Sequence, residues 1–208
     1  RGLTYDVGAD NSPDYEKIIS LKPDVIMTYG DAEGNDASDT KLNRMGGAVV
    51  INFDYMEQHP LARAEWIKFI GVLYNMEDVA DSIFNDIETK YNAVKDSVTN
   101  IRASKQPRVV CNSPFKGIWY MPCGENYTCK LIADAGGDFI WKDANNSNGL
   151  NLSLDYESVF EKAHNADYWL LNSTSSSIRE LVEMDSRNKS FLAIQVKSVF
   201  NYDKRKTA

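Results

Sequence analysis

The sequence contains little cysteine, little histidine and no long apolar run. Its 208 residues include three cysteines and two histidines, and 23 lysines and arginines are outnumbered by 30 aspartates and glutamates. A net charge of −7 without a basic patch argues against a nucleic-acid-binding protein, whose surface must neutralise phosphates. No uninterrupted apolar stretch approaches the ~20 residues that a bilayer-crossing helix needs. With 43% apolar residues, the composition favours one large globular domain or two small lobes.

Catalytic and metal-binding motifs are also missing. The sequence has no phosphate-binding GxxxxGKS/T loop, no GxGxxG, HExxH or GxSxG motif, and no CxxC pair. His59 lies in a loop and His164 near the end of a predicted helix, and neither has a second metal ligand at a suitable spacing. The acidic stretch 31–39 lacks the spacing of a calcium loop. We therefore expect no catalytic residue, and no metal or cofactor of the protein's own.

The three cysteines leave one question open. Cys111 lies in an apolar run, which predicts a buried thiol. Cys123 and Cys129 flank the polar loop 124–128, and this spacing is compatible both with a local disulfide and with two separate thiols. One such pair is weak evidence for an oxidising compartment.

Residues 13–53 alternate between helical and extended patterns. Apolar residues at helical spacing behind an acidic, proline-containing turn predict a helix over 13–21. Short apolar runs at 25–29 and 48–53 have the length of buried strands, and a short helix ending at Met45 separates them. A strand, a helix and a strand at this spacing predict a parallel pair with a right-handed crossover.

The middle of the sequence is helical. Residues 61–74 follow a helical pattern, and Asn75 is expected to cap a second helix. From Val79 to Ile101 apolar residues recur every three or four positions without proline or glycine, which predicts one amphipathic helix up to about Ser104. Such a helix is about 40 Å long. It suits a rod that connects two lobes, although an ordinary long core helix has the same pattern.

The alternation of strands and helices resumes after Pro107. The patterns predict extended segments at 108–112, 117–121, 166–172 and 198–202, and helices at 127–135, 155–165 and 177–184. We therefore expect an α/β fold of two lobes, with mostly parallel sheets flanked by helices and one long α-helix between the lobes. The expected parts are an N-terminal lobe at 1–75, a connecting helix at 76–105 and a C-terminal lobe at 106–208.

A three-residue motif occurs once in each predicted lobe. Asp14-Tyr15-Glu16 and Asp155-Tyr156-Glu157 each open a helix that a short strand follows. In both, the aspartate stands at the N-cap and the glutamate in the first turn, where the helix dipole favours negative charge. The repeat suggests two pseudo-equivalent lobes, although capping preference alone also produces such a match.

Aromatic side chains gather at the predicted ends of strands. They are Tyr29, Phe53, Tyr55, Trp119, Tyr120 and Trp141. Ligands of open α/β sheets bind beyond the carboxyl ends of the strands, and aromatic groups on both sides of a cleft suit a large, flat or partly apolar ligand. Any single one of these residues can equally well pack in a core.

Several motifs along the chain resemble one known family in their order. They are Asp6-Val7-Gly8, Leu21-Lys22-Pro23-Asp24-Val25-Ile26, Pro60-Leu61-Ala62-Arg63-Ala64-Glu65-Trp66, Trp119-Tyr120-Met121-Pro122, Leu131-Ile132-Ala133-Asp134-Ala135-Gly136-Gly137, Asp155-Tyr156-Glu157-Ser158-Val159, Ala166-Asp167-Tyr168-Trp169 and Phe191-Leu192-Ala193-Ile194. Together they resemble the periplasmic or lipid-anchored substrate-binding proteins of ABC importers for iron complexes and cobalamin. In this family one long helix joins two α/β lobes.

The resemblance implies a non-enzymatic solute-binding component, located in the periplasm or anchored outside the membrane as a lipoprotein. Its two lobes would close over a metal complex, which is a ferric siderophore, a haem or cobalamin. The expected ligand contacts are Tyr29, Tyr55, Trp119, Tyr120, Trp141 and Asn148. The resemblance also implies that Glu16 and Glu157 dock on arginines of a membrane permease dimer, because carboxylates suit bidentate arginine contacts.

Two other interpretations stay open. An enzyme on a similar two-lobed scaffold, such as a metal-chelatase or a nitrogenase-like protein, would need a base or metal ligands facing the cleft. The third interpretation is an interaction module without a ligand. Family members usually have a further α/β segment ahead of Asp6-Val7-Gly8 and a final helix after the last strand. We therefore expect a chain that is shortened at both ends, with an incomplete first lobe.

Overall fold

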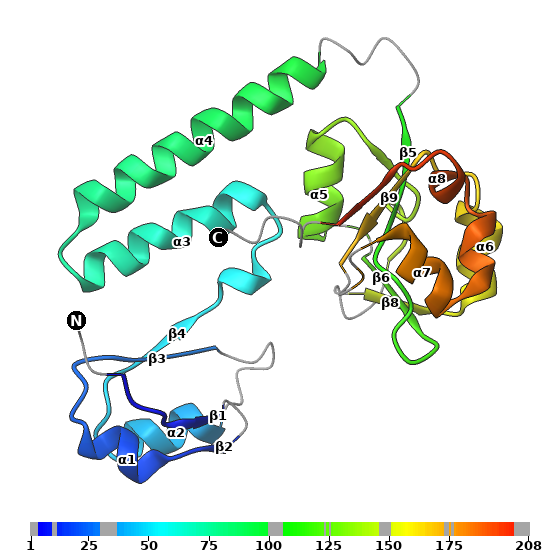
Figure 1. The fold of residues 1–208 in the computed structure, drawn as a ribbon. Helices are drawn as coiled ribbons and strands as arrows, with labels where there is room; N and C mark the ends of the chain where they lie inside the picture. Colours follow the sequence, from blue (N-terminus) through cyan, green and yellow to red (C-terminus); the bar gives the residue numbers. More distant parts are fainter. Residues whose placement is uncertain are drawn as a thin grey trace. The chain divides into compact units, whose positions relative to one another are not determined.

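The computed structural model of the protein describes residues 4–9, 12–29, 37–99, 106–122, 124, 126–145, 151–172, 175 and 177–201. Its elements fall into two compact units, residues 1–57 and 58–208 (Figure 1). The α/β class predicted from the sequence is confirmed. The units divide after Glu57. The expected parts, with lobes at 1–75 and 106–208 and a connecting helix at 76–105, stay a prediction.

The first unit is built on a parallel pair of strands. Its elements are β1 (Gly8–Ala9), β2 (Ser12–Pro13), α1 (Tyr15–Ser20), β3 (Ile26–Tyr29), α2 (Ala37–Arg44), β4 (Val49–Asn52) and the 3-10 helix η1 (Asp54–Met56). Tyr29 pairs with Asn52 in the register of β3 and β4, and the predicted parallel arrangement is confirmed. The N-cap of α1 is Asp14, whose Oδ1 accepts a hydrogen bond from the Lys17 N–H at 3.0 Å.

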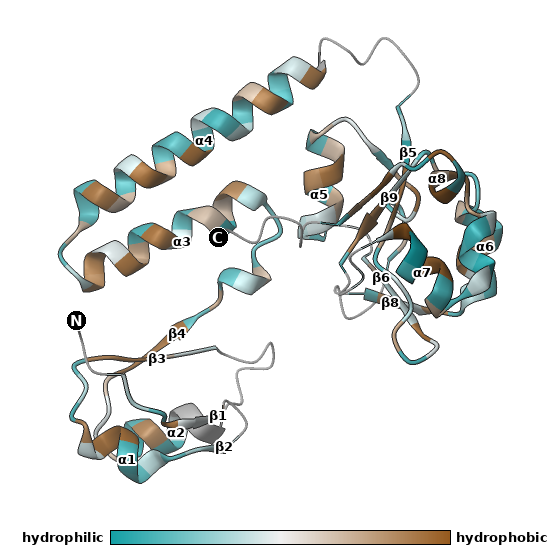
Figure 2. Ribbon diagram, in the orientation of Figure 1, coloured by the Kyte–Doolittle hydropathy of each residue, from teal (hydrophilic) through white to brown (hydrophobic). Residues whose placement is uncertain are grey.

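Two helices, α3 (Pro60–Leu73) and α4 (Glu77–Thr99), open the second unit and pack side by side (Figure 1). The predicted long helix is α4, and Figure 2 shows hydrophobic and hydrophilic residues alternating along it. Its role as a connecting rod stays a prediction. Asn75 does not cap α4 but lies in the turn before it, with a φ of 53°.

A four-stranded parallel sheet forms the centre of the second unit. Its order is β10 (Val199–Asn201), β9 (Tyr168–Leu171), β5 (Arg108–Cys111), β7 (Asp138–Phe139). A separate antiparallel pair consists of β6 (Trp119–Pro122) and β8 (Asn151–Leu154). The helices are α5 (Tyr127–Asp134), α6 (Tyr156–Ala163), α7 (Ile178–Met184), η2 (Ser186–Ser190) and α8 (Leu192–Gln195). The sequence patterns predicted these elements except β7, β8, η2 and α8.

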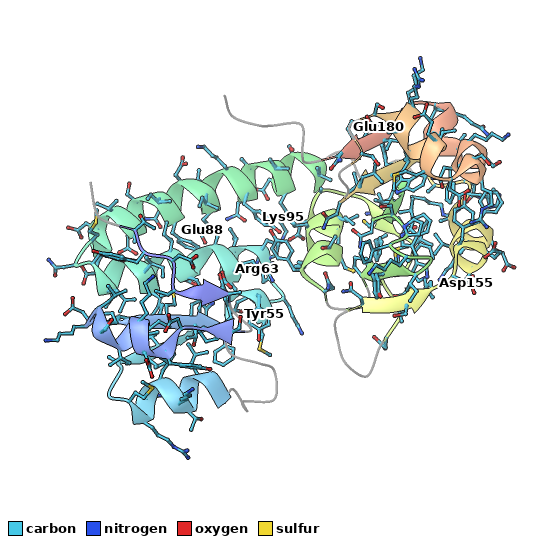
Figure 3. The ribbon with its side chains drawn as sticks, turned by 60° about the horizontal axis from the view of Figure 1, so that its bottom comes forward. Tyr55, Arg63, Glu88, Lys95, Asp155 and Glu180 are labelled. Carbon is cyan, nitrogen blue, oxygen red and sulfur yellow. The ribbon has the colours of Figure 1, made fainter. Side chains whose placement is uncertain are left out.

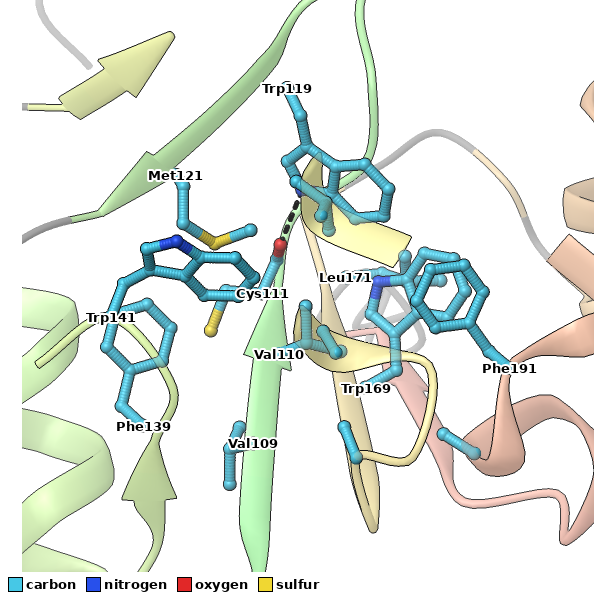
Figure 4. Close-up of a cluster of buried hydrophobic side chains, with 14 of the residues drawn as sticks. Val109, Val110, Cys111, Trp119, Met121, Phe139, Trp141, Trp169, Leu171 and Phe191 are labelled. Carbon is cyan, nitrogen blue, oxygen red and sulfur yellow. Dashed lines mark hydrogen bonds between the residues drawn. The ribbon is translucent and has the colours of Figure 1, made fainter. Parts of the chain in front are cut away.

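Aromatic rings fill the core beside this sheet (Figure 4). Trp119 stacks on Trp169 with ring centroids 5.5 Å apart, and Phe191 packs on Trp169 at 4.6 Å. The Trp119 indole N–H donates to the Cys111 carbonyl at 2.8 Å. The Trp169 indole N–H donates to the Asn112 carbonyl at 2.7 Å. Both buried donors are therefore satisfied, and both rings are fixed against the end of β5.

Candidate functional site

Two tyrosines lie at the carboxyl end of the parallel pair in the first unit. Tyr29 is the last residue of β3, and Tyr55 belongs to η1, which follows β4 (Figure 3). Their ring centroids are 6.3 Å apart at an interplanar angle of 67°, which is an edge-to-face contact. Tyr29 is 63% exposed, and Tyr55 is half-buried. The structure thus brings together two predicted ligand contacts at the edge where α/β sheets bind ligands.

Tyr29 also lines a groove of about 410 Å³ within the first unit. The rest of its lining comes mainly from β1, β3, α1 and the loop between α1 and β3, and it contains no charged side chain. The buried Thr28 hydroxyl in this lining has no hydrogen-bond partner in the described part of the chain. The groove therefore offers contacts to apolar groups and few polar atoms to orient a ligand.

Phe115, which the sequence patterns did not single out, lies in the turn after β5. The Phe115 N–H donates to the Ile118 carbonyl at 2.8 Å, and the Ile118 N–H donates back at 3.1 Å. Between them Lys116 and Gly117 have φ values of 52° and 81°, as a two-residue type I′ turn requires. This turn leaves Phe115 63% exposed. Gly117, which opens the second of the predicted extended segments 108–112 and 117–121, was the signal for such a turn.

The aromatic contacts predicted for the second unit lie in different environments. Tyr120 is exposed on β6, between buried neighbours. The structure contradicts the prediction for Trp119 and Trp141, which are 0% and 4% exposed. Trp119 belongs to the stacked core, and Trp141 packs on Phe139 with ring centroids 6.2 Å apart (Figure 4). Burying a tryptophan ring removes a large apolar area from water, and these two rings contribute to packing instead of ligand contact.

Two predicted residues lie outside the described part of the chain. They are Asn148, the predicted polar contact, and Cys123, one half of the possible disulfide. The disulfide therefore stays a prediction. The suggested partner of Cys123, Cys129, is buried on α5. Cys111 is buried in β5 as predicted, and this burial, with a smaller effect of Cys129, raises the pKa of its thiol to about 12. The thiol is therefore protonated near neutral pH and a poor nucleophile.

Both histidines have structural contacts at helix ends. His59 Nδ1 accepts a hydrogen bond from the Leu61 N–H at 3.1 Å and caps α3. His164 Nδ1 lies 3.0 Å from the Phe160 carbonyl at the end of α6. Within the described ranges, no group of three histidine, cysteine, aspartate or glutamate side chains can hold a metal ion. The helices of those ranges include none long and apolar enough to cross a membrane.

The two glutamates predicted to dock occupy the same position in α1 and α6. Glu16 is exposed in the first turn of α1, and Glu157 is exposed in the first turn of α6. The N-cap of α6, Asp155 (Figure 3), accepts a hydrogen bond from the Ser158 N–H at 2.6 Å. This bond lowers the pKa of Asp155. Both glutamates are therefore accessible to a partner, as docking requires.

Glu157 has an intramolecular partner that the sequence did not predict. Arg187 of η2 donates from Nη1 to Glu157 Oε1 at 2.6 Å. The same guanidinium pairs with Asp185 at 2.6 Å and lies over the Tyr156 ring, 3.8 Å from its centroid. The hydrogen bond from Arg187 lowers the pKa of Asp185, and that pairing raises the pKa of Arg187. The pair joins residues 30 positions apart, and no local sequence pattern marks it.

Comparisons with known proteins place the sequence in a family. The family model described as periplasmic binding protein matches residues 3–205. An uncharacterized lipoprotein of Methanocaldococcus jannaschii, MJ0878, is 29% identical over 202 residues, which cover 96% of this chain and 47% of the relative. A second, MJ0872, is 31% identical over 179 residues, which cover 82% and 43%. The chain spans about half the length of the curated relatives it matches.

Solved structures share the fold. The periplasmic haem-binding protein HutB of Vibrio cholerae has a TM-score of 0.71 at 17% identity, over 94% of this chain and 73% of that one. The siderophore-binding protein FhuD of the same species, with Fe³⁺–Desferal bound, has a TM-score of 0.71 at 18% identity, over 95% and 72%. An ABC transporter solute-binding protein of Sulfurospirillum deleyianum has a TM-score of 0.65 at 21% identity, over 91% and 56%. Because the family model covers nearly the whole sequence, the chain belongs to the periplasmic binding protein family, with the fold of ABC transporter solute-binding proteins.

Proposed function

We propose that the protein is the solute-binding component of an ABC importer for an iron complex or cobalamin. It captures a ferric siderophore, a haem or cobalamin outside the cytoplasmic membrane and delivers it to a permease dimer. A haem-binding and a siderophore-binding protein share its fold, and two relatives are named lipoproteins, which supports the ligand class and a lipid anchor. The metal belongs to the ligand, and the protein needs no metal ligands of its own.

The observation that carries this proposal is the exposure of aromatic rings after parallel strands in both units. Tyr29, at the end of β3, provides such a ring in the first unit, and Phe115, in the turn after β5, provides one in the second. Tyr120, on β6 of the antiparallel pair, is a further exposed ring. A flat, largely apolar macrocycle or aryl group makes extensive contact with rings of this kind. Lys116 Nζ lies 5.3 Å from the Phe115 ring centroid. A cation at this position suits a ligand with carboxylates, which favours haem or an anionic siderophore.

Ligand titration tests the proposal. The protein is titrated separately with haem, a ferric hydroxamate siderophore and cyanocobalamin, with tryptophan fluorescence quenching and ligand absorbance as readouts. We expect saturable binding of at least one ligand. Substituting Tyr29→Ala or Phe115→Ala should weaken that binding by about tenfold, because one aromatic contact contributes ~0.5–1.5 kcal/mol beyond its buried area.

An exposed tyrosine away from the strand ends is the matched control. Tyr74 lies in the turn between α3 and α4 and is exposed. The Tyr74→Ala variant should bind the ligand as the unchanged protein does. The absence of saturable binding to all three ligands would overturn the proposal. Equal weakening by Tyr74→Ala and Tyr29→Ala would show that the strand-end aromatics have no special role.

A further inference from the structure

Each unit repeats the same local arrangement around its Asp-Tyr-Glu motif. In α1 the Asp14 carboxylate caps the Lys17 N–H, and in α6 the Asp155 carboxylate caps the Ser158 N–H. The tyrosine and the glutamate therefore take the first two helical positions in both units. The capping hydrogen bond is the same in the two motifs, which the sequence match alone did not require.

A cation covers the tyrosine ring in both motifs. Lys41 Nζ of α2 lies 3.7 Å from the Tyr15 ring centroid. The Arg187 guanidinium carbon lies 3.8 Å from the Tyr156 ring centroid. Lys41 and Arg187 come from unrelated positions along the chain, and yet each places a positive charge on the face of the corresponding ring. Cation–π attraction holds each charge on the tyrosine ring that precedes the exposed glutamate, and Arg187 also contacts Glu157 directly.

Both cations keep donors for a further partner. Arg187 donates three guanidinium N–H groups to Asp185 and Glu157. Two of its five N–H groups then lack an acceptor in the part of the chain that the structure describes. Lys41 makes no ion pair with a carboxylate among the described residues, and its ammonium carries three donors. Each motif thus carries a glutamate as an acceptor and, on the adjacent tyrosine ring, a cation with donors to spare.

We propose that Lys41 and Arg187 are partner-contacting residues of two equivalent docking patches, each made of a glutamate, a tyrosine and a cation. This inference rests on the proposed function, in which Glu16 and Glu157 dock on the permease. A patch with both charges selects a partner surface that carries an arginine for the glutamate and a carboxylate or carbonyl oxygen for the cation. On a uniformly basic partner surface, the remaining donors of Lys41 and Arg187 would find no acceptor.

Binding to the permease of the importer, purified in lipid nanodiscs, tests this inference. Lys41→Gln and Arg187→Gln should each weaken the association about two- to fivefold, the range expected for one exposed ion pair. Lys41→Arg and Arg187→Lys keep the charge and should retain most of the affinity. Matched controls are Lys90→Gln and Arg179→Gln, which remove exposed cations that pair within one helix. These controls should leave the association unchanged.

The glutamate variants Glu16→Gln and Glu157→Gln separate the two hypotheses. If they weaken the association while Lys41→Gln and Arg187→Gln leave it unchanged or tighten it, docking by the glutamates stands and this inference is overturned. If the unchanged protein does not bind the permease, or the glutamate variants bind as well as it does, the docking proposal fails, and this inference fails with it. Thermal unfolding of each variant shows whether it is folded. If the Arg187→Gln variant is not folded, the affinity of the Lys41→Gln variant tests the inference.

Discussion

The carboxylate of Asp134 in α5 forms a hydrogen bond and an ion pair with side chains of α4. The Asp134 side chain is 8% exposed, and its Oδ2 accepts a hydrogen bond from the Tyr91 hydroxyl of α4 at 2.6 Å. Lys130 and Lys95 lie 3.3 and 3.5 Å from its Oδ1. Burial raises the pKa of Asp134, but the bonds from Tyr91 and Lys130 and the charge of Lys95 outweigh it and lower the pKa below its usual range. The partners thus stabilise a buried carboxylate in its charged form.

Substituting Asp134→Asn should destabilise the protein by about 1–3 kcal/mol near neutral pH, because two ammonium groups lose their partner. A lowered folded-state pKa means that the stabilisation is present above the unfolded-state pKa of ~3.9 and is lost as the pH falls through the folded-state value. The difference in stability between the two proteins should therefore shrink below about pH 4. Urea unfolding at pH 7, 5 and 3 measures it.

The exposed Asp86 pairs with Lys90 at the same helical spacing as Asp134 with Lys130. Asp86→Asn is therefore the matched control, and it should cost less than about 0.5 kcal/mol, because exposed pairs contribute little. A difference between the Asp134→Asn variant and the unchanged protein that stays constant from pH 7 to 3 would contradict the assigned role of Asp134.

Single residues were also where prediction from the sequence was least complete. Tyr29 and Tyr55 could be placed together, because the parallel register of two adjacent strands determines which residues share an edge. Trp119 and Trp141 have the same local signal, but burial depends on which face of the chain meets the core. The Arg187 pair depends on packing between η2 and α6, which no local pattern encodes. Strand-end position is thus visible in the sequence, whereas exposure is not.

At the scale of elements, the crossing of α3 and α4 depends on one glycine. Gly71 is buried, and a Cβ atom at this position would lie 2.6 Å from the Cβ of Ala80. A side-chain rotation cannot relieve this contact, because both Cβ atoms are attached directly to the backbone. The close approach of the two helices therefore requires a hydrogen atom in place of a side chain at Gly71.

Substituting Gly71→Ala should lower the stability by about 1–3 kcal/mol, the usual cost of overpacking, although alanine is the better helix former. Thermal and urea unfolding measure the loss. Ala80→Gly removes the opposing methyl group and costs about 1 kcal/mol by itself. The double variant should lose less than the sum of the single variants, because the clash is gone. Simple additivity would show that the contact between Gly71 and Ala80 does not limit the crossing.

Elements with a clear apolar pattern were predictable, and some of the shortest ones were not. The stripe from Val79 onward predicted α4, because a sustained spacing of three and four residues fits only a helix. In contrast, β7 has two residues and α8 has four, too few to show a period. Both exist because neighbouring elements supply their hydrogen bonds and packing. Tertiary context thus determined the elements that the sequence patterns missed.

At the scale of the molecule, the two units differ in how much apolar surface they bury. The aromatic and aliphatic core lies in the second unit, where Trp119, Trp169, Phe191 and many aliphatic side chains are buried. Among the described residues of the first unit, Leu42 and Asn52 are the buried ones. Apolar residues of β3, including Met27 and Tyr29, are exposed. Burial of apolar area is the main source of stability, which implies that the first unit is the less stable of the two.

Hydrogen exchange should therefore show at least about tenfold faster exchange for amides of β3 and β4 than for those of β5 and β9. The four tryptophans, Trp66, Trp119, Trp141 and Trp169, all lie in the second unit, and their fluorescence reports the unfolding of that unit alone. In urea, far-ultraviolet circular dichroism should begin to change before the fluorescence does.

A core substitution in the first unit distinguishes separate from joint unfolding. Leu42→Ala should accelerate exchange in β3 and β4, because truncating a buried leucine costs ~2–5 kcal/mol, and it should leave β5 and β9 unchanged. Val110→Ala, at a fully buried position of β5, is the reciprocal variant and should lower the fluorescence midpoint. If Leu42→Ala accelerates exchange equally in all four strands, the two units unfold as one cooperative body. The lower stability expected from the small core of the first unit would then be absent.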